Sequence, residues 1–379
     1  MSSSEFGPVS AEEKRANSGK TVNFLYPGSF SPITGAHKSA VEKLLQFGLF
    51  RGYTKVNVYI IPATNQYNKA SIFKPAEGDP AADYLSEGAR MQFLEIAKSK
   101  MDIPDNCEVI ISRADFKYGS GRYILDGKVS SGLTPTAFLA VNFNKDISIN
   151  GADSSEPQTE KLLENADNFD NADTFLILGA DNAYTDIVGW GDPKKILDNI
   201  QILVIARGDQ PSDPSRSVKT YYKLANGDKP VSPKPFGEVV AERNSIYGSG
   251  YDLQSEMDRK YKKLEFVVPE ISSSLLRKII KNQAIDVDEF KTVLDQLRSN
   301  DPSIESASTY LENDKVKLNK TEYVVGLLTP IPADVLTSTY ENKGDLREPS
   351  GGSKTKQKKR RITKKRKASK KRRNYSKKH

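Results

Sequence analysis

The sequence predicts an α/β protein built on a Rossmann-like, doubly wound parallel sheet, and two features of the chain predict it. Short apolar runs alternate with stretches of helical periodicity along most of the chain. Several of the runs, such as FLIL at 175–178 and ILVI at 202–205, are apolar at every position. Continuous apolar runs are typical of strands that are covered on both faces, as in a parallel sheet.

The expected elements follow in order along the chain. Strands are predicted at about 22–26, 55–62, 108–114, 174–180, 201–208 and 264–270. Helices are predicted at about 36–50, 86–100 and 193–200, and from about residue 272 onward. Ser86 is a suitable N-cap for the second helix, and Pro193 suits the first turn of the third.

Two long polar segments, 116–172 and 209–262, interrupt this alternation and are interpreted as insertions into one domain. The expected organisation is a disordered N-terminus at 1–20, a sheet domain at 21–282, a mostly helical continuation of that domain at 283–345, and a disordered basic tail at 346–379.

Charge is distributed unevenly along the chain. The net charge is +8 over 379 residues, but residues 351–379 contain 16 Lys and Arg and no Asp or Glu, which leaves −8 for residues 1–350. We therefore expect the tail at 354–378, and not the folded part, to contact nucleic acid or an import receptor, which favours the nucleus over the cytoplasm; a solvated tail that only aids solubility is the alternative.

Other features of the composition indicate an intracellular protein. Cys107 is the only cysteine, so no internal disulfide is possible, which suits a reducing compartment. The N-terminus has no apolar signal sequence, and no apolar run approaches the roughly 18 residues of a membrane span.

Candidate chemistry is concentrated in PGSFSPITGAH, residues 27–37, directly after the first predicted strand. Ligands of open parallel sheets bind at the carboxyl ends of strands. Gly28 lets the backbone approach a phosphate, and His37, in the first turn of the next helix, can donate to a phosphate oxygen. The stretch matches neither the G-x-G-x-x-G fingerprint nor a P-loop.

Residues 28–37 resemble the signature of the nucleotidyltransferase superfamily, in the form most similar to eukaryotic-type nicotinamide-mononucleotide adenylyltransferases. Further segments resemble the family in the same order, over about 21–345: Tyr67-Asn68-Lys69, Arg90-Met91, FLILGADN (175–182) followed by Trp190, ILVIARG (202–208), ISSSLLR (271–277) and LLTPIPADVLTSTYEN (327–342).

The resemblance implies transfer of the adenylyl group of ATP to nicotinamide mononucleotide, and possibly also to the nicotinate form, without a covalent intermediate. It implies that Mg²⁺ is held mainly by the ATP phosphates rather than by protein ligands, and that the chain could form a homo-oligomer. The implied catalytic residues are His37, Lys69 and Arg277. The implied ATP contacts are Gly28, Ser29, Phe30, His37, Gly179, Asp181, Ser272, Ser273 and Arg277, and those to the mononucleotide are Ser29, Phe30, Lys69, Trp190 and Arg207.

Structural roles remain open for these residues. His37 could be a packing or capping histidine, the serines at 272–274 and Asp181 could cap helices, Trp190 could be core, and Arg207 could pair with an acidic neighbour. Two other functions also remain open: a nucleotidyltransferase of this fold that uses CTP or another acceptor, and a non-catalytic nucleotide-binding module tethered to nucleic acid by the tail.

Overall fold

The computed structural model describes residues 3–63, 85–114, 124–125, 128–129, 140–143, 146–149, 158–161, 163, 169–180, 182–190, 192–207, 217–218 and 234–341. Lys69 with its neighbours Tyr67 and Asn68, Asp181, the side chain of Arg207 and the basic tail lie outside these residues. The interpretations placed on them remain predictions.

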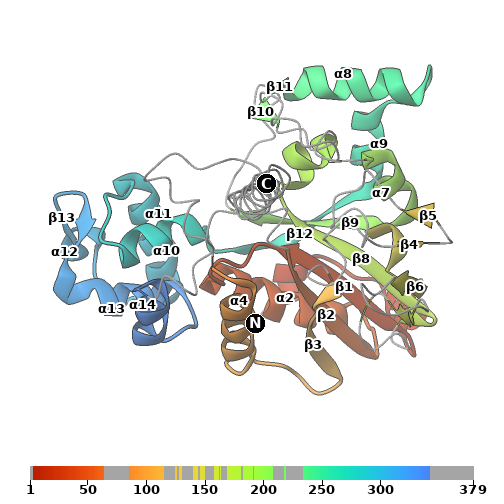
Figure 1. Cartoon of the computed structure of the whole chain (residues 1–379). Coiled ribbons are helices and arrows are strands. Elements are labelled where there is room, and N and C mark those ends of the chain that lie inside the picture. Colours follow the sequence, from red (N-terminus) through yellow and green to blue (C-terminus); the bar gives the residue numbers. More distant parts are fainter. Residues whose placement is uncertain are drawn as a thin grey trace, which may run out of the picture.

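Six parallel strands form the central sheet, which confirms the predicted fold class (Figure 1). Their order is β12-β9-β8-β1-β2-β3, the arrangement of a doubly wound fold in which the chain returns to the middle of the sheet at its fourth strand. The strands are β1 (Thr21–Gly28), β2 (Lys55–Pro62), β3 (Cys107–Ile111), β8 (Ala172–Gly179), β9 (Gln201–Arg207) and β12 (Tyr261–Val268).

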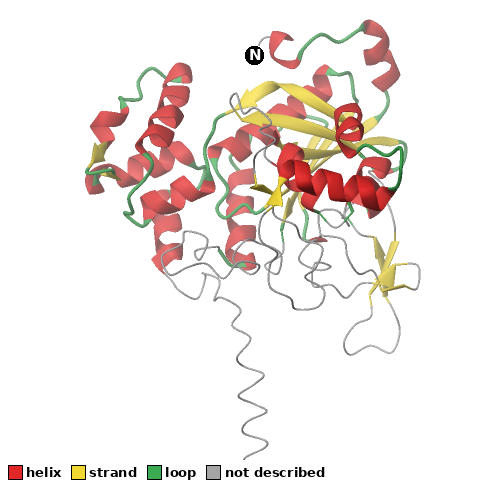
Figure 2. Ribbon diagram, turned by 90° about the horizontal axis from the view of Figure 1, so that it is seen from above, coloured by secondary structure: helices red, strands yellow, loops and turns green. Residues whose placement is uncertain are grey.

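Helices cover both faces of this sheet (Figure 2). On β1, Phe24 and Tyr26 belong to one hydrophobic core and Leu25 to a second, because successive side chains of a strand point to opposite faces. The first core includes residues of α2 (Gly35–Phe50), α4 (Glu87–Lys98) and α10 (Ser273–Ile280), and the second includes residues of α7 (Pro193–Asn199), α8 (Phe236–Tyr247) and α9 (Leu253–Lys260).

The expectation of disorder over residues 1–20 is wrong for residues 3–20. This segment forms a short 3₁₀ turn, η1 (Ser3–Phe6), and helix α1 (Ala11–Asn17). The ring of Phe6 is only 5% exposed and packs against Phe47, Phe50 and Phe266. One aromatic side chain thus anchors a segment whose polar composition predicts disorder.

The two segments interpreted as insertions contain regular structure. The first holds a small antiparallel sheet made of β4 (Ile124–Leu125), β5 (Lys128–Val129), β6 (Asp146–Ile149) and β7 (Gln158–Lys161). The second holds the two-stranded pair β10 (Ser217–Val218) and β11 (Lys234–Pro235), and then α8 and α9. These two helices bury Val239, Leu253 and Met257 in the second core, where they pack against α7 and η5 (Ile187–Gly189).

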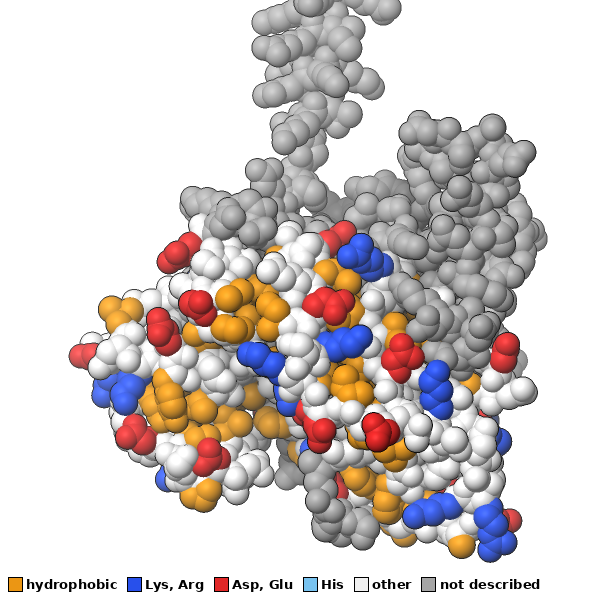
Figure 3. All heavy atoms as spheres, turned by 90° about the horizontal axis from the view of Figure 1, so that it is seen from below, with side chains coloured by type: hydrophobic (Ala, Val, Ile, Leu, Met, Phe, Trp, Pro, Cys, Tyr) orange, Lys and Arg blue, Asp and Glu red, His pale blue; other side chains and the backbone are white. Residues whose placement is uncertain are grey.

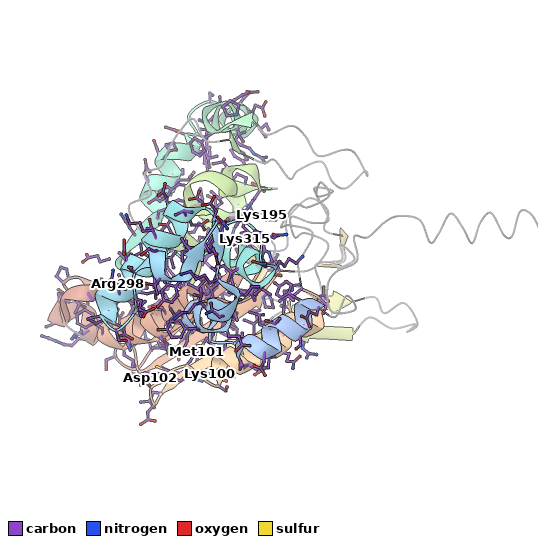
Figure 4. All side chains as sticks on the ribbon, turned by 90° about the vertical axis from the view of Figure 1, so that its left-hand side faces the viewer. Lys100, Met101, Asp102, Lys195, Arg298 and Lys315 are labelled. Carbon is purple, nitrogen blue, oxygen red and sulfur yellow. The ribbon has the colours of Figure 1, made fainter. Side chains whose placement is uncertain are left out.

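The C-terminal region packs beside α4 and α10. It contains α11 (Val287–Asn300), α12 (Ala307–Tyr310), β13 (Leu311–Glu312), β14 (Lys315–Val316), η7 (Leu318–Lys320), α13 (Thr321–Leu328) and α14 (Ala333–Glu341). Lys100, which lies beside Met101 and Asp102 just after α4 (Figure 4), donates to the carbonyl of Pro330 at 2.6 Å. This contact ties the closing segment to the sheet domain.

Acidic and basic side chains are interspersed over the face drawn in Figure 3, as expected for a folded part that lacks the tail's excess of cations. None of the helices within the described ranges combines the length and the apolar composition that crossing a membrane requires.

We predict that Phe6→Ala lowers the free energy of unfolding by about 3 kcal/mol, because it empties a pocket between three aromatic rings. Urea denaturation followed by circular dichroism measures the change. Leu318→Ala is the control, since that side chain is 76% exposed and its loss should cost under about 0.5 kcal/mol. Equal effects of the two substitutions would contradict the anchoring role of Phe6.

Candidate functional site

The candidate site lies where the first and fourth strands of the sheet, β1 and β8, end side by side. Their pairing stops at Leu25 and Leu176, whereas β1 stays paired with β2 as far as Gly28 and Pro62. The last three residues of β1 are therefore no longer hydrogen-bonded to β8. In doubly wound sheets this switch point, outside the carboxyl ends of the strands, is where ligands bind. Gly179, the last residue of β8, lies at the same edge.

The turn that leaves β1 folds around the ring of Phe30. Phe30 is buried, and its backbone takes a positive φ of 46°, which is uncommon for a residue with a side chain. Its ring packs edge-on against His37, with centroids 5.1 Å apart, and against Tyr26 at 5.6 Å. A Cβ added at Gly28 would lie 2.9 Å from this ring. Glycine is thus required at position 28 by the packing of Phe30.

His37 is held in a defined orientation at the start of α2. Thr34 is the N-cap of this helix, and its backbone N–H donates to Nδ1 of His37 at 3.1 Å. The arrangement is a capping box in which histidine stands in the position usually held by Glu or Gln. The Oγ1 of Thr34 also lies 2.8 Å from Nδ1. In the neutral tautomer in which Nδ1 accepts the N–H of Thr34, the ring proton is on Nε2. The capping role is therefore observed.

The N-terminus of α10 is fastened to the same turn. Arg277, which is 3% exposed, donates to the carbonyl of Ser31 and to Oγ of Ser274. The hydroxyl of Ser273 donates to the carbonyl of Pro32 at 2.8 Å. The starts of α2 and α10 are therefore brought together, and helix N-termini present N–H groups and a positive dipole end to an anion.

Ser272 has the capping role that its position predicts. Its Oγ accepts from the N–H of Leu275 at 3.0 Å and lies 2.8 Å from a carboxylate oxygen of Glu289, to which it donates. These contacts link the start of α10 to α11. They define a structural role for Ser272, and a contact with ATP remains a prediction.

Arg90 is a second buried arginine that holds the turn. This side chain, on α4, is 0% exposed and donates from one nitrogen to the carbonyls of Ser29 and Ala63, at 3.0 and 2.6 Å. The turn therefore lies between two buried guanidinium groups, one on α4 and one on α10. We did not predict a site role for Arg90, although Arg90-Met91 is one of the segments that carry the resemblance.

The closing segment supplies the last support. The hydroxyl of Thr329, which follows α13, donates to the carbonyl of Ile33 at 2.8 Å. Thr329 belongs to the closing segment of the resemblance but was not among the predicted site residues. Its hydrogen bond shows why that segment accompanies the turn: it holds residue 33 in place just ahead of the N-cap.

Trp190 follows η5 (Ile187–Gly189), on the chain that leaves β8 through η4 (Asn182–Asp186). It is 9% exposed and belongs to the second core. Most of the side chain is thus covered by the protein, as the core interpretation expects. Arg207 ends β9, where its backbone pairs with Val268 of β12. The structure therefore joins the turn to α10 directly. Arg207 lies at the end of β9, and Trp190 lies on the chain that follows the neighbouring strand β8.

The polar groups gathered at the turn are mainly N–H and guanidinium donors, which suit an anion better than a cation. Among the residues that the structure describes, no three His, Cys, Asp or Glu side chains are grouped so that they could hold a metal ion.

Comparisons with known proteins give weak similarities. No protein-family model matches the chain, and no curated protein matches it either. Among solved structures it is similar to Plasmodium falciparum nicotinic acid mononucleotide adenylyltransferase complexed with APC, at 14% identity and a TM-score of 0.33, over 76% of this chain and 98% of that one. The same enzyme complexed with NaAD gives 14% identity and a TM-score of 0.32, with the same coverage. At these values neither match supports a conclusion about the reaction of this chain.

We predict that Gly28→Ala destabilises the protein by about 1–3 kcal/mol, because the added methyl group has to displace the Phe30 ring. Gly237→Ala is the matched control: a Cβ there meets no atom within 4 Å, and in helix α8 the change should be neutral or stabilising. Thermal unfolding of both variants measures the effects. Equal melting temperatures of the two variants would mean that the packing of Phe30 does not require glycine at position 28.

Proposed function

We propose that this protein is an adenylyltransferase that joins ATP to nicotinamide mononucleotide or nicotinate mononucleotide, releasing pyrophosphate. One observation carries the proposal: GSFSPITGAH and ISSSLLR, the two most specific segments of the resemblance, meet in space. Arg277 and Ser273 of the second bind Ser31 and Pro32 of the first, across more than 240 residues of sequence. Two motifs that resemble one family and also form one site are stronger support than either motif alone.

The proposed reaction needs two anions to be held in line. A phosphate oxygen of the mononucleotide attacks the α-phosphorus of ATP, the bond from that phosphorus to the bridging oxygen breaks, and pyrophosphate leaves. Such a transfer depends mainly on positioning and on charge stabilisation, so the protein has to supply donors rather than a nucleophile.

In this proposal His37 donates from Nε2 to a phosphate oxygen of ATP. The capping box supports the role, because it fixes the tautomer and the ring orientation before substrate arrives. The N-termini of α2 and α10 add backbone N–H groups directed at the same anion. Arg277 acts mainly by holding Ser31, and its charge favours the phosphates. Lys69 is proposed as a further phosphate contact, by resemblance alone.

Magnesium is expected to arrive with the nucleotide. Because the donors at the turn suit an anion, we propose that ATP phosphates and water, and not a cluster of protein carboxylates, hold the ion.

The two alternative functions differ in what they predict for the purified chain. The test is chromatographic detection of dinucleotide after incubation with ATP, Mg²⁺ and either mononucleotide in parallel. If dinucleotide forms with only one of the two mononucleotides, that mononucleotide is the acceptor. Product with CTP or another phosphate acceptor only, or ATP binding by calorimetry without any product, would replace the proposal with one of the alternatives.

The sharpest variant is His37→Gln, because glutamine retains the capping box while removing the imidazole. Unfolding free energy should stay within about 0.5 kcal/mol of wild type, while the rate of dinucleotide formation falls at least about 100-fold. His37→Ala should lose the same activity and, in addition, about 1 kcal/mol of stability with the cap. Wild-type activity in the His37→Gln protein would mean that His37 serves only as a helix cap.

A further inference from the structure

We propose that Arg243, on helix α8, is a positioning residue that fixes Trp190, the side chain on which the resemblance implies that the pyridine ring of the mononucleotide stacks. The inference rests on the proposed function for the identity of the ring. It gives a role to the second segment interpreted as an insertion, to which the resemblance assigns none.

Arg243 contacts the Trp190 segment directly. Arg243 is buried, with 5% of its surface exposed, and it reaches from α8 to the chain that follows β8. Its Nε donates to the carbonyl of Val188 at 3.2 Å and its terminal nitrogen to the carbonyl of Trp190 at 2.6 Å. One planar guanidinium group thus fixes two carbonyls two residues apart, and with them the backbone from which the Trp190 ring projects.

A second contact from the same face of α8 supports the first. Tyr247 lies four residues after Arg243, one helical turn further on. Its hydroxyl donates to a carboxylate oxygen of Asp192 at 3.1 Å and lies 3.4 Å from the backbone N–H of Lys194, which donates to it. Burial raises the pKa of Tyr247 to about 12, so the hydroxyl keeps its proton at neutral pH. Helix α8 therefore holds the chain on both sides of Trp190.

The Trp190 ring is also held by core packing. Trp190 is 9% exposed and packs in the core on the α7 and α8 side of the sheet, so its indole has little freedom to adjust to a ligand. Stacking depends on the offset and the distance between two rings. A ring position set by the backbone and by core packing is pre-organised, and it loses little conformational freedom when a second ring stacks on it.

Trp190 is the only tryptophan in the chain, so fluorescence excited at wavelengths that tyrosine does not absorb reports on this side chain alone. In the protein without substrate, Arg243→Met should shift the emission to longer wavelength and increase quenching by acrylamide. In steady-state assays the KM for the mononucleotide should rise about tenfold while the KM for ATP stays within about twofold. Arg243→Lys, which keeps the charge but cannot bridge both carbonyls, should lie between wild type and Arg243→Met.

Arg259→Met is the matched control, because Arg259 is an exposed arginine of the same segment that pairs with Glu256 and should leave every readout unchanged. Unchanged emission and acrylamide quenching in Arg243→Met and Arg243→Lys would overturn the positioning role, whatever the activity. A changed emission with equal effects on both KM values would overturn the link to the mononucleotide. Failure of the proposed function has a different signature: the wild-type chain forms no dinucleotide, while the fluorescence comparison still decides whether Arg243 positions Trp190.

Discussion

The turn between β1 and α2 is held by hydrogen bonds from buried side chains of three separate elements, and the rest of the site depends on this constraint. Arg90 from α4 binds Ser29, Arg277 from α10 binds Ser31, and Thr329 after α13 binds Ile33. A turn packed into protein cannot leave its carbonyls without donors, because an unpaired buried carbonyl costs about 1–3 kcal/mol. The segments that carry Arg90, Arg277 and Thr329 therefore have to be packed before the turn that leads to His37 reaches its final conformation.

Buried arginine recurs in this protein as the means of holding irregular backbone. Arg90, Arg277 and Arg243 each donate to at least one main-chain carbonyl of a segment that leaves the carboxyl end of a strand. Arginine suits the task because its planar group carries five donors and keeps its charge, whereas lysine offers a single point of attachment on a flexible stem. Backbone hydrogen bonds hold the strands in place, and these arginine side chains hold the loops at this edge of the sheet.

The sheet could be predicted from the sequence because several of its strands are buried on both faces and read as apolar runs, such as ILVI at 202–205, whereas β12 alternates buried and exposed positions. The turn and the start of α10 could be predicted because glycine, proline, serine and histidine leave a recognisable pattern. The packing of Phe6 could not be predicted, since one aromatic residue in a polar segment gives no periodicity. The role of Arg243 could not be predicted either, because its partners are main-chain carbonyls, whose positions no sequence pattern records. Its helix also lies in a polar stretch in which only three apolar side chains, Val239, Leu253 and Met257, join the second core among the described residues.

The distances in sequence between the supports of the turn also determine when the site can form during synthesis. The hydrogen bond from Thr329 to Ile33 spans 296 residues, and that from Arg277 to Ser31 spans 246. At typical translation rates, Thr329 is made about 15–60 s after Ile33. The first strands and α2 can collapse on the ribosome within this interval, but the turn lacks its closing donors until the last helices emerge. Completion of the turn on a nascent chain is thus deferred until Thr329 has been made, and the contacts of widest sequence separation are expected to form late in folding.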